Sequence, residues 1–323
     1  ARGGNALNIL LPKEITPAMF GAGTNIPAVD PYVNEIAWAS GADGVVGDKR
    51  VRGSYVYECI KAVTGAPANT YAPDSAQGGE FWFKDDATPT NRWAPFDEYL
   101  FTKARALGQV KYVINPGFVN GVEVHGVEAD SITVTATDGE GGPELMAPVT
   151  VDMWDQAYGL WEYLFGDLQR STKGSVKGLP IHPNLCVTVI AARTTPDEQA
   201  AVGYISIGQW QRFLAPDSLS SGTVTSASAE LKSYSYYDKK KDGTYTRRRG
   251  RQSTDLSITC TVKADEGPRV RNVLARVLDV PVAMEAVPTS KFSWLSTVGF
   301  ITGGISAPSN GLIDIDIKVE GNI

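Results

Sequence analysis

The sequence predicts a mainly β, multidomain protein, and three observations support this prediction. Several short runs alternate apolar with polar residues, which is the period of a half-buried strand. Clusters of Gly, Pro, Asn and Asp separate these runs and are typical of turns. A length of 323 residues exceeds what one typical hydrophobic core holds, so two or three domains are expected.

Residues 1–31 are expected to form an extended N-terminal arm. Pro12, Pro17, Pro27 and Pro31 interrupt regular structure there, together with two glycines. Segments of this kind usually lie along a partner or a neighbouring domain, because they cannot bury enough apolar surface by themselves. The arm is therefore predicted to dock rather than to fold alone.

Residues 32–97 are expected to form a small β domain in which aromatic residues gather. The stretch "VVGDKRVRGSYVYECIKAVTG" predicts two short strands bounded by glycines. The aromatic residues in or beside these strands are Trp38, Tyr55, Tyr57 and Trp82. So small a domain needs aromatic packing for stability, but an apolar ring face can equally hold a sugar. Core packing and glycan binding both remain open, with Trp38 and Trp82 the best candidates for exposed rings.

Residues 98–215 are expected to form an antiparallel β-sandwich. "VKYVIN" and "ITVTAT" alternate apolar with polar residues, and "LCVTVIAA" and "GYISIGQW" continue the pattern. Short strands without alternating helices favour an antiparallel sandwich. Within this region "AYGLWEYLFGDL" has the apolar spacing of a short helix or wide turn, which is expected to cover one end of the sandwich.

Residues 216–323 are expected to form an α+β domain, a sheet with one covering helix. A hairpin with the tip "DKKKDG" comes first, followed by an amphipathic helix in "DEGPRVRNVLARVLDVP". The apolar residues of this helix recur at helical spacing: Val270, Val273, Leu274, Val277 and Leu278. "GLIDIDIKVEG" then alternates like a strand with one buried face. A hairpin, one helix and two strands make a compact α+β domain.

Little in the sequence points to an enzyme, a metal or a cofactor. His125 and His182 have no third histidine or cysteine pair to complete a zinc site, and neither accompanies a nucleophile motif. Cys59, Cys186 and Cys260 include no C-x-x-C pair and are expected to be buried, reduced thiols. No stretch approaches the roughly 18 apolar residues of a membrane span. The chain opens without a secretory signal pattern, and the three unpaired cysteines predict synthesis in a cytoplasm.

The hairpin carries a strongly basic segment in an otherwise acidic chain. Its basic residues are Lys239, Lys240, Lys241, Arg247, Arg248, Arg249 and Arg251. With two aspartates the segment has a net charge of 7 − 2 = +5, so the rest of the chain carries −6 − 5 = −11. A solvated tip is one interpretation. Contact with an acidic neighbouring subunit or with phosphorylated polysaccharide is the other, and nucleic acid is disfavoured because no aromatic platform or recognition helix accompanies the charge.

Several motifs resemble parts of tail proteins from tailed bacteriophages. One pattern is similar to small chitin-binding-type carbohydrate modules, and its residues are Trp38, Gly47, Asp48, Val51, Gly53, Tyr57, Cys59, Gly65 and Trp82. "TNRWAPFD", at residues 90–97, resembles a segment that follows such modules in those tail proteins. The central region resembles their galactose-binding-like jelly roll, and the basic hairpin with its helix and strands resembles their C-terminal part.

The resemblance implies a structural component of a bacteriophage tail tip or baseplate, with a role in tail assembly and in attachment to host-surface glycans. It further implies other tail proteins and bacterial surface polysaccharide as partners, a trimeric or hexameric homo-oligomer, and a place in the virion tail after synthesis in the host cytoplasm. The alternatives are a stand-alone lectin and the accessory modules of a glycan-degrading enzyme. A stable monomer with sugar affinity would favour the lectin, and a ring would favour the structural role.

Overall fold

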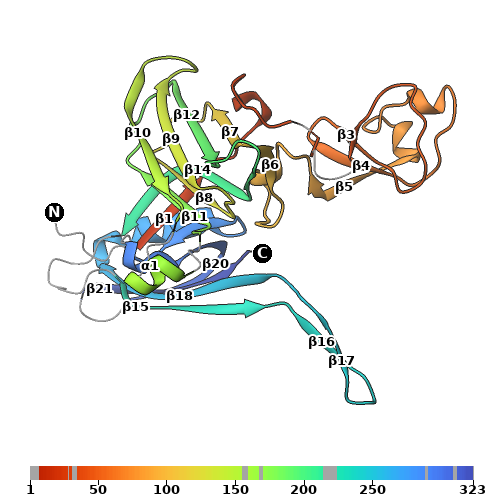
Figure 1. Cartoon of the computed structure of the whole chain (residues 1–323). Helices are drawn as coiled ribbons and strands as arrows, with labels where there is room; N and C mark the ends of the chain where they lie inside the picture. Colours follow the sequence, from red (N-terminus) through yellow and green to blue (C-terminus); the bar gives the residue numbers. More distant parts are fainter. Residues whose placement is uncertain are drawn as a thin grey trace. The chain divides into compact units, whose positions relative to one another are not determined.

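The structure is a computed structural model that describes residues 7–27, 29–30, 35–154, 159–166, 170–213, 224–287, 290–307 and 311–322. The chain is mainly β, as the sequence predicts, and folds as two compact units (Figure 1). Unit 1 comprises residues 1–14, 119–122 and 206–323, and unit 2 comprises residues 15–118 and 123–205. Among the described residues, no helix has both the length and the apolarity needed to cross a bilayer.

Unit 1 contains a large antiparallel sheet. Its strands follow the hydrogen-bonded order β14-β1-β19-β20-β21-β18-β15. The strands are β1 (Leu7–Pro12), β14 (Tyr204–Phe213), β15 (Val224–Ser233), β18 (Gln252–Lys263), β19 (Val282–Glu285), β20 (Ser296–Ser306) and β21 (Leu312–Gly321). The short 3-10 helix η6 (Ser290–Leu295) precedes β20. The predicted strand "GLIDIDIKVEG" is β21 of this sheet, and the base of the predicted basic hairpin contributes β15 and β18.

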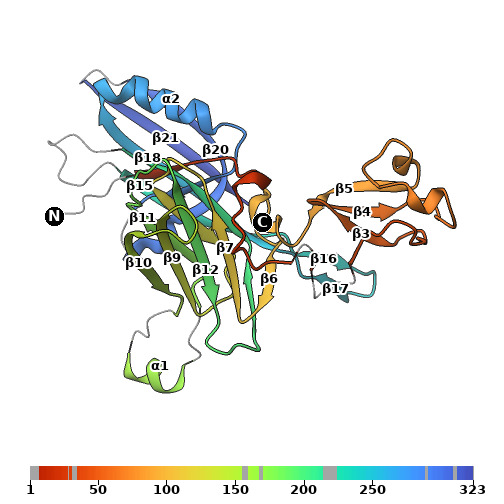
Figure 2. The ribbon, with the colours of Figure 1, turned by 90° about the horizontal axis from the view of Figure 1, so that it is seen from above.

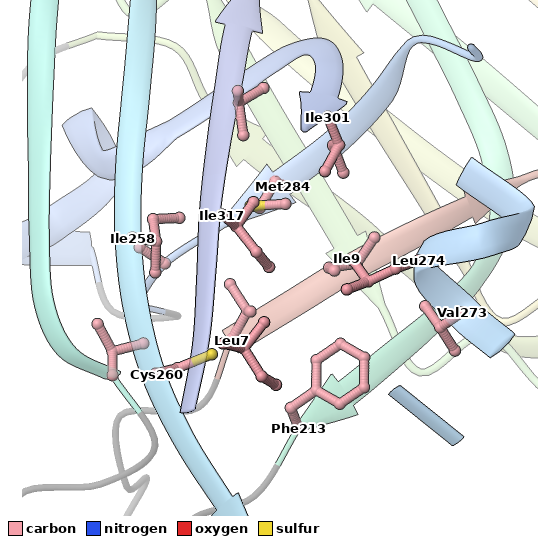
Figure 3. Packing of buried hydrophobic residues seen from close by; sticks show 14 of the residues in the cluster. Leu7, Ile9, Phe213, Ile258, Cys260, Val273, Leu274, Met284, Ile301 and Ile317 are labelled. Atoms are coloured by element: carbon pink, nitrogen blue, oxygen red, sulfur yellow. The ribbon is translucent and has the colours of Figure 1, made fainter. Parts of the chain in front are cut away.

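The helix α2 (Gly267–Val277) covers the sheet of unit 1, after a 3-10 turn η5 (Ala264–Glu266). Val270, Val273, Leu274 and Val277 are buried, which confirms the predicted amphipathic helix. Figure 2 shows α2 beside the sheet, and Figure 3 shows Leu7 and Ile9 of β1 among side chains from the helix and from β14. Leu278 is 51% exposed because the helix has ended there.

The predicted N-terminal arm is wrong for residues 7–12, which form β1 inside the sheet. β1 pairs on one side with β14, where Leu7 faces Phe213, and on the other with β19, where Asn8 faces Glu285. Leu7 and Ile9 are fully buried. The prolines that suggested an arm begin only at Pro12, so they end the strand instead of preventing it.

The next part of the predicted arm lies along unit 2. After the short 3-10 helix η1 (Pro17–Met19), Phe20 forms a bridge with Ile114. The Gly21 N–H then donates to the Val113 carbonyl at 2.8 Å. Residues 20–25 therefore follow an existing strand edge, which supplies the hydrogen-bond partners that such a segment cannot supply for itself.

Unit 2 contains a β-sandwich. One antiparallel sheet has the order β10-β9-β12-β7, and the strands outside it include a β6–β13 pair. The strands are β6 (Ala104–Leu107), β7 (Gln109–Ile114), β8 (Gly121–His125), β9 (Ser131–Asp138), β10 (Glu144–Asp152), β11 (Lys173–Lys177), β12 (Leu185–Ala192) and β13 (Gln199–Val202). A Cβ at Gly174 of β11 would lie 2.6 Å from the Ile132 Cδ1 atom of β9, so only glycine lets the two layers approach this closely.

The helix predicted between β10 and β11 is present as α1 (Leu160–Phe165). Its expected role as a cover for the sandwich is wrong. Leu160 is 75% exposed, Trp161 is 77% exposed, and the two rings of Trp161 and Phe165 contact each other with centroids 4.5 Å apart. Helical spacing predicts the helix but does not identify the surface it packs against. Tyr158, which was expected on the same face, lies outside the described residues.

The small domain of unit 2 is a four-stranded sheet with the order β2-β3-β4-β5. Its elements are β2 (Ile36–Ala37), β3 (Lys49–Arg52), β4 (Tyr55–Cys59), β5 (Trp82–Pro89) and the 3-10 helices η2 (Ala68–Thr70) and η3 (Gly78–Glu80). Gly53 at φ 61° makes the turn between β3 and β4. This left-handed conformation favours glycine because it lacks a Cβ.

The three cysteines are buried and unbonded, as the sequence predicts. Cys59 belongs to the core of the small domain, and Cys260 belongs to the core of unit 1. Burial raises the pKa of the Cys260 thiol to about 12. Since the thiolate is the reactive species, a thiol of this kind is chemically inert at neutral pH.

Candidate functional site

Two of the four candidate glycan-binding aromatics belong to the core of the small domain. Trp82 is 3% exposed and Tyr57 is 6% exposed, and both pack with Cys59 and Val63. The prediction that Trp82 presents an exposed ring is therefore wrong. A domain of this size buries its largest side chain because few other residues can fill its core.

The other two aromatics, Trp38 and Tyr55, keep part of their surface. Tyr55 is 44% exposed, and the Lys84 ammonium lies 3.6 Å from its ring centroid. The Arg52 guanidinium lies 4.7 Å from the centroid of the half-buried Trp38 ring. Each cation is attracted by the negative face of its ring. The four aromatics therefore do not make one shared stacking platform.

The basic residues lie on or beside a two-stranded hairpin of unit 1, formed by β16 (Tyr236–Lys239) and β17 (Tyr245–Arg248). Figure 1 shows this hairpin continuing beyond β15 and β18. Every residue of both strands is exposed, and so are the remaining basic residues Lys240, Lys241, Arg249 and Arg251. The predicted basic residues are thus gathered on one projecting element.

Pairing across the hairpin combines the positive charge with aromatic rings. Tyr237 faces Arg247 and Tyr236 faces Arg248 in the strand register. The guanidinium carbons lie 5.7 and 5.8 Å from the facing ring centroids. Such pairs place each guanidinium beside the ring of the tyrosine that it faces. The hairpin therefore presents ordered cationic and aromatic groups together.

The segment "TNRWAPFD" ties several strands of unit 2 together. The Asn91 side chain bonds both backbone groups of Arg105, donating to the carbonyl at 3.2 Å and accepting from the N–H at 2.8 Å. Arg92 donates from Nε and Nη2 to the Ile26 carbonyl, at 3.1 and 2.9 Å. The segment then makes the 3-10 helix η4 (Ala94–Phe96). These bonds fix where the neighbouring aromatic rings stand.

The aromatic rings around this segment form a compact cluster of edge-to-face contacts. Trp93 lies 5.1 Å from Phe20, and Phe96 lies 5.5 Å from Phe20 and 5.4 Å from Tyr112, between ring centroids. Tyr112 is fully buried, and its hydroxyl donates to the Arg92 carbonyl at 2.8 Å. Edge-to-face contacts at these distances are favourable. Sequence reasoning singled out the segment but not the partners that the fold brings to it.

Asp97 is the last residue of this segment, and its carboxyl group is expected to make the stability of the fold depend on pH. Burial raises its pKa to about 6, against hydrogen bonds from the Thr102 hydroxyl at 2.5 Å and the Tyr99 N–H at 2.8 Å. A carboxyl with a raised pKa stabilises the fold below its unfolded pKa, and this contribution is lost as the pH rises through about 6. Stability is expected to fall by about 1 kcal/mol between pH 4 and 7, a value reduced for the partial exposure of the group.

Asp97→Asn is expected to remove this pH dependence because the amide stays neutral. Urea unfolding at several pH values, followed by fluorescence, measures it. Asp197→Asn, at an exposed position, serves as the control and should retain the wild-type profile. If the free energy of unfolding changed equally with pH in the wild type and in Asp97→Asn, the pH dependence would not come from Asp97.

A buried charged cluster lies elsewhere in unit 2, on β8 and β11. Glu123 and His125 are each 2% exposed, and the Glu123 Oε1 atom lies 2.8 Å from His125 Nε2. Burial lowers the pKa of Lys173, while the Glu123 carboxylate acts to raise it. The alternating sequence of β8 would predict that Glu123 faces water. All five residues of the strand are instead buried, because both of its faces are covered.

No protein family model and no curated protein sequence matches this chain.

Proposed function

We propose that the protein is a structural component of a bacteriophage tail tip or baseplate, and that the hairpin β16–β17 is one of its assembly contacts. The observation that carries the proposal is the exposure of this ribbon, with tyrosine rings and arginine side chains paired along it. Tyrosine and arginine are enriched in protein interfaces, where an aromatic ring supplies area and a guanidinium supplies hydrogen bonds. A solvated tip has no need of three aromatic rings.

The length and isolation of the hairpin support a docking role. A two-stranded ribbon without a third strand or a covering helix is marginally stable in water. Tyr236, Tyr237 and Tyr245 are each more than half exposed, so the free protein leaves their apolar surface in solvent. Binding to a neighbouring subunit would bury that surface and hold the ribbon in place.

Charge supports an acidic partner surface. The segment from Asp238 to Arg251 carries +5, and the rest of the chain carries −11. Opposite charges steer two surfaces together and reject wrong partners. A second copy of the chain, whose residues outside this segment carry a net charge of −11, would be a partner of opposite charge, as would an acidic tail protein. A head-to-tail contact between copies closes into a ring when the rotation allows, which agrees with a trimer or hexamer in a virion tail.

The proposal predicts a loss of association after charge reversal. The variant Arg247→Glu/Arg248→Glu/Arg249→Glu is expected to weaken self-association or binding to neighbouring tail proteins at least tenfold at low salt. Sedimentation velocity over a concentration series measures self-association, and co-sedimentation with tail particles measures the second contact. The effect should shrink as the salt concentration rises, because salt screens exposed charges.

A matched variant tests whether any loss of association is specific to the hairpin or follows from the change in net charge alone. Arg271→Glu/Arg276→Glu/Lys318→Glu makes the same charge change at exposed positions of α2 and β21. It should associate like the wild type. Unchanged association of the hairpin variant in both assays would overturn the assembly role, and a wild type that stays monomeric while binding sugar would favour a lectin.

A further inference from the structure

The sheet of unit 1 has an open edge at β15. The hydrogen-bonded strand order ends at β15, so no strand among the described residues pairs with its outer side (Figure 1). β15 has ten residues, and its pairing with β18 is regular from Ser226 to Ser233. An edge strand leaves a row of backbone N–H and C=O groups that can pair with another chain. The edge of β15 is therefore a surface to which a further strand can add.

β15 lacks most of the features by which proteins protect the edge of a sheet. Common protections are short edge strands, prolines, bulges and uncompensated charges. The strand contains no proline, and the one irregularity in its pairing lies at its start, between Val224 and Ser226. Its single lysine, Lys232, is balanced by Glu230, so the strand carries no net charge. A partner strand would thus meet neither a missing donor nor a net repulsion.

The side chains of β15 indicate which strand would fit its edge. Ala227 and Ala229 pack against the core of unit 1, and Leu231 lies on the same face because side chains alternate along a strand. Leu231 is nevertheless 83% exposed. Glu230 and Lys232 flank Leu231 on the opposite face. An acid and a base on either side of a central residue form a pattern that is complementary to itself in an antiparallel pair.

The charges around Glu230 also leave room for a second lysine. Glu230 faces Asp255 of β18 in the strand register, and Lys232 forms an ion pair with Asp255. Like charges that face each other across two strands are unfavourable. An ammonium has three donors, so Lys232 can bind Asp255 and one further carboxylate. The lysine of another copy would therefore compensate Glu230 without breaking the ion pair within its own chain.

We infer that β15 forms a twofold contact between two copies of this chain, in which the two β15 strands pair antiparallel with Leu231 at the centre. Leu231 faces Leu231 of the second copy, and Glu230 of each copy faces Lys232 of the other. The two sheets then continue into each other through backbone hydrogen bonds. The contact is isologous, because both copies use the same surface.

The inference goes beyond the hairpin contact and does not depend on it. A twofold contact and a head-to-tail contact are compatible, because they use different surfaces of unit 1. A head-to-tail ring of three copies that is joined to a second such ring through β15 would be a hexamer.

Cysteine cross-linking of the full chain tests the contact and its register. Leu231→Cys places two thiols on directly opposite residues, whose Cα atoms lie about 4.5 or 5.5 Å apart in an antiparallel pair. Both distances allow a disulfide. Oxidised glutathione should convert most of this variant into a covalent dimer, whereas the wild type should not cross-link, because its three cysteines are buried.

Ser228→Cys is the matched control for this cross-link. Ser228 is an exposed residue of the same strand, but in the inferred register it lies opposite Tyr234 of the second copy. The two Ser228→Cys thiols would then be separated by six residues along the strands, about 20 Å, which is too far for a disulfide. A Leu231→Cys variant that cross-links no more than Ser228→Cys would overturn the contact.

Charge reversal tests the pairing of Glu230 with Lys232. Glu230→Lys puts lysine opposite lysine twice in the contact, so the dissociation constant of the dimer is expected to rise at least tenfold at low salt. Glu14→Lys makes the same charge change at an exposed residue of unit 1 outside β15, and it should dimerise like the wild type. Sedimentation equilibrium measures all three proteins. Equal constants for Glu230→Lys and the wild type would overturn the register, and a wild type that is monomeric at every concentration would overturn the contact.

The hairpin variant separates this contact from the one proposed above. Arg247→Glu/Arg248→Glu/Arg249→Glu, combined with Leu231→Cys, should still give the covalent dimer while losing any larger assembly. Loss of the cross-link in this combination would mean that the hairpin holds the two copies together, and it would overturn the contact through β15.

Discussion

Ile9→Ala is expected to lower the free energy of unfolding of unit 1 by about 2–5 kcal/mol. The Ile9 side chain is fully buried, and its strand is hydrogen bonded on both sides, with Ile9 facing Gln211 on β14 and Met284 on β19. The substitution removes apolar area from the shared core and leaves a cavity that these neighbours cannot readily fill. Figure 3 shows the side chains of α2 and β14 around this position.

Hydrogen exchange is the suitable measurement, because two units can unfold in separate transitions. Amides of β14 and β19 should exchange faster in Ile9→Ala, while those of β9 and β12 in unit 2 should not change. Ile36→Ala is the matched control, because Ile36 is 57% exposed, and this substitution should lower the free energy of unfolding only slightly. A loss smaller than about 1 kcal/mol would mean that residues 7–12 behave as a loose arm.

Glu123→Leu is expected to lower the free energy of unfolding of unit 2 by about 3 kcal/mol. The substitution leaves the buried His125 Nε2 atom without its partner at 2.8 Å and removes the negative charge that acts on Lys173. Removing one member of a buried polar pair costs more than the pair itself contributes, because the other member stays buried without compensation.

The pH dependence of this variant distinguishes lost charge compensation from lost packing. The pKa of Lys173 is already lowered by burial, and without Glu123 it should fall further. A lysine with a lowered pKa destabilises the fold below that pKa, and stability is regained as the pH rises toward the unfolded value of 10.5. The deficit of Glu123→Leu should therefore shrink at alkaline pH.

A double variant and a surface control complete the test. Glu123→Leu/Lys173→Met removes both charges and should regain part of the loss, as apolar replacements of buried pairs commonly do. Glu144→Leu, on an exposed position of β10, should change stability little. Urea unfolding at pH 7 and pH 10 measures all three variants. If Glu123→Leu lost the same free energy of unfolding at both pH values, and the double variant regained none of it, the Glu123 carboxylate would not be compensating the charge of Lys173.

Strands with one buried face were predictable from the sequence. β21 alternates as predicted, with Ile313, Ile315, Ile317 and Val319 buried. The helix α2 was also predictable from the sequence, because its apolar residues form a continuous stripe over three turns. Strands covered on both faces gave no such signal, so β1 was predicted to be part of an arm, and the burial of Glu123 and His125 in β8 was not predicted.

The candidate sites were predictable only where they are local in sequence. The hairpin follows from the turn signal "DKKKDG" between two strand-like runs, and the structure places all its basic residues together. Tyr55 and Tyr57 share a strand face, yet one is 44% exposed and the other 6%, because the core ends between them. The aromatic cluster joins Phe20 to Trp93 and Phe96, and this approach depends on the fold of the intervening chain.

The central position of β1 also determines when unit 1 can be completed during synthesis. Its two partner strands are Tyr204–Phe213 and Val282–Glu285, and most of unit 2 lies between β1 and both of them in the sequence. At ordinary translation rates the ribosome needs on the order of tens of seconds to reach them. Throughout that time the apolar stretch "LNILL" has no native strand to pair with, while the residues of unit 2 are all emerging. Unit 1 therefore closes after the residues of unit 2 have emerged, and until then β1 is an unpaired apolar strand that can aggregate.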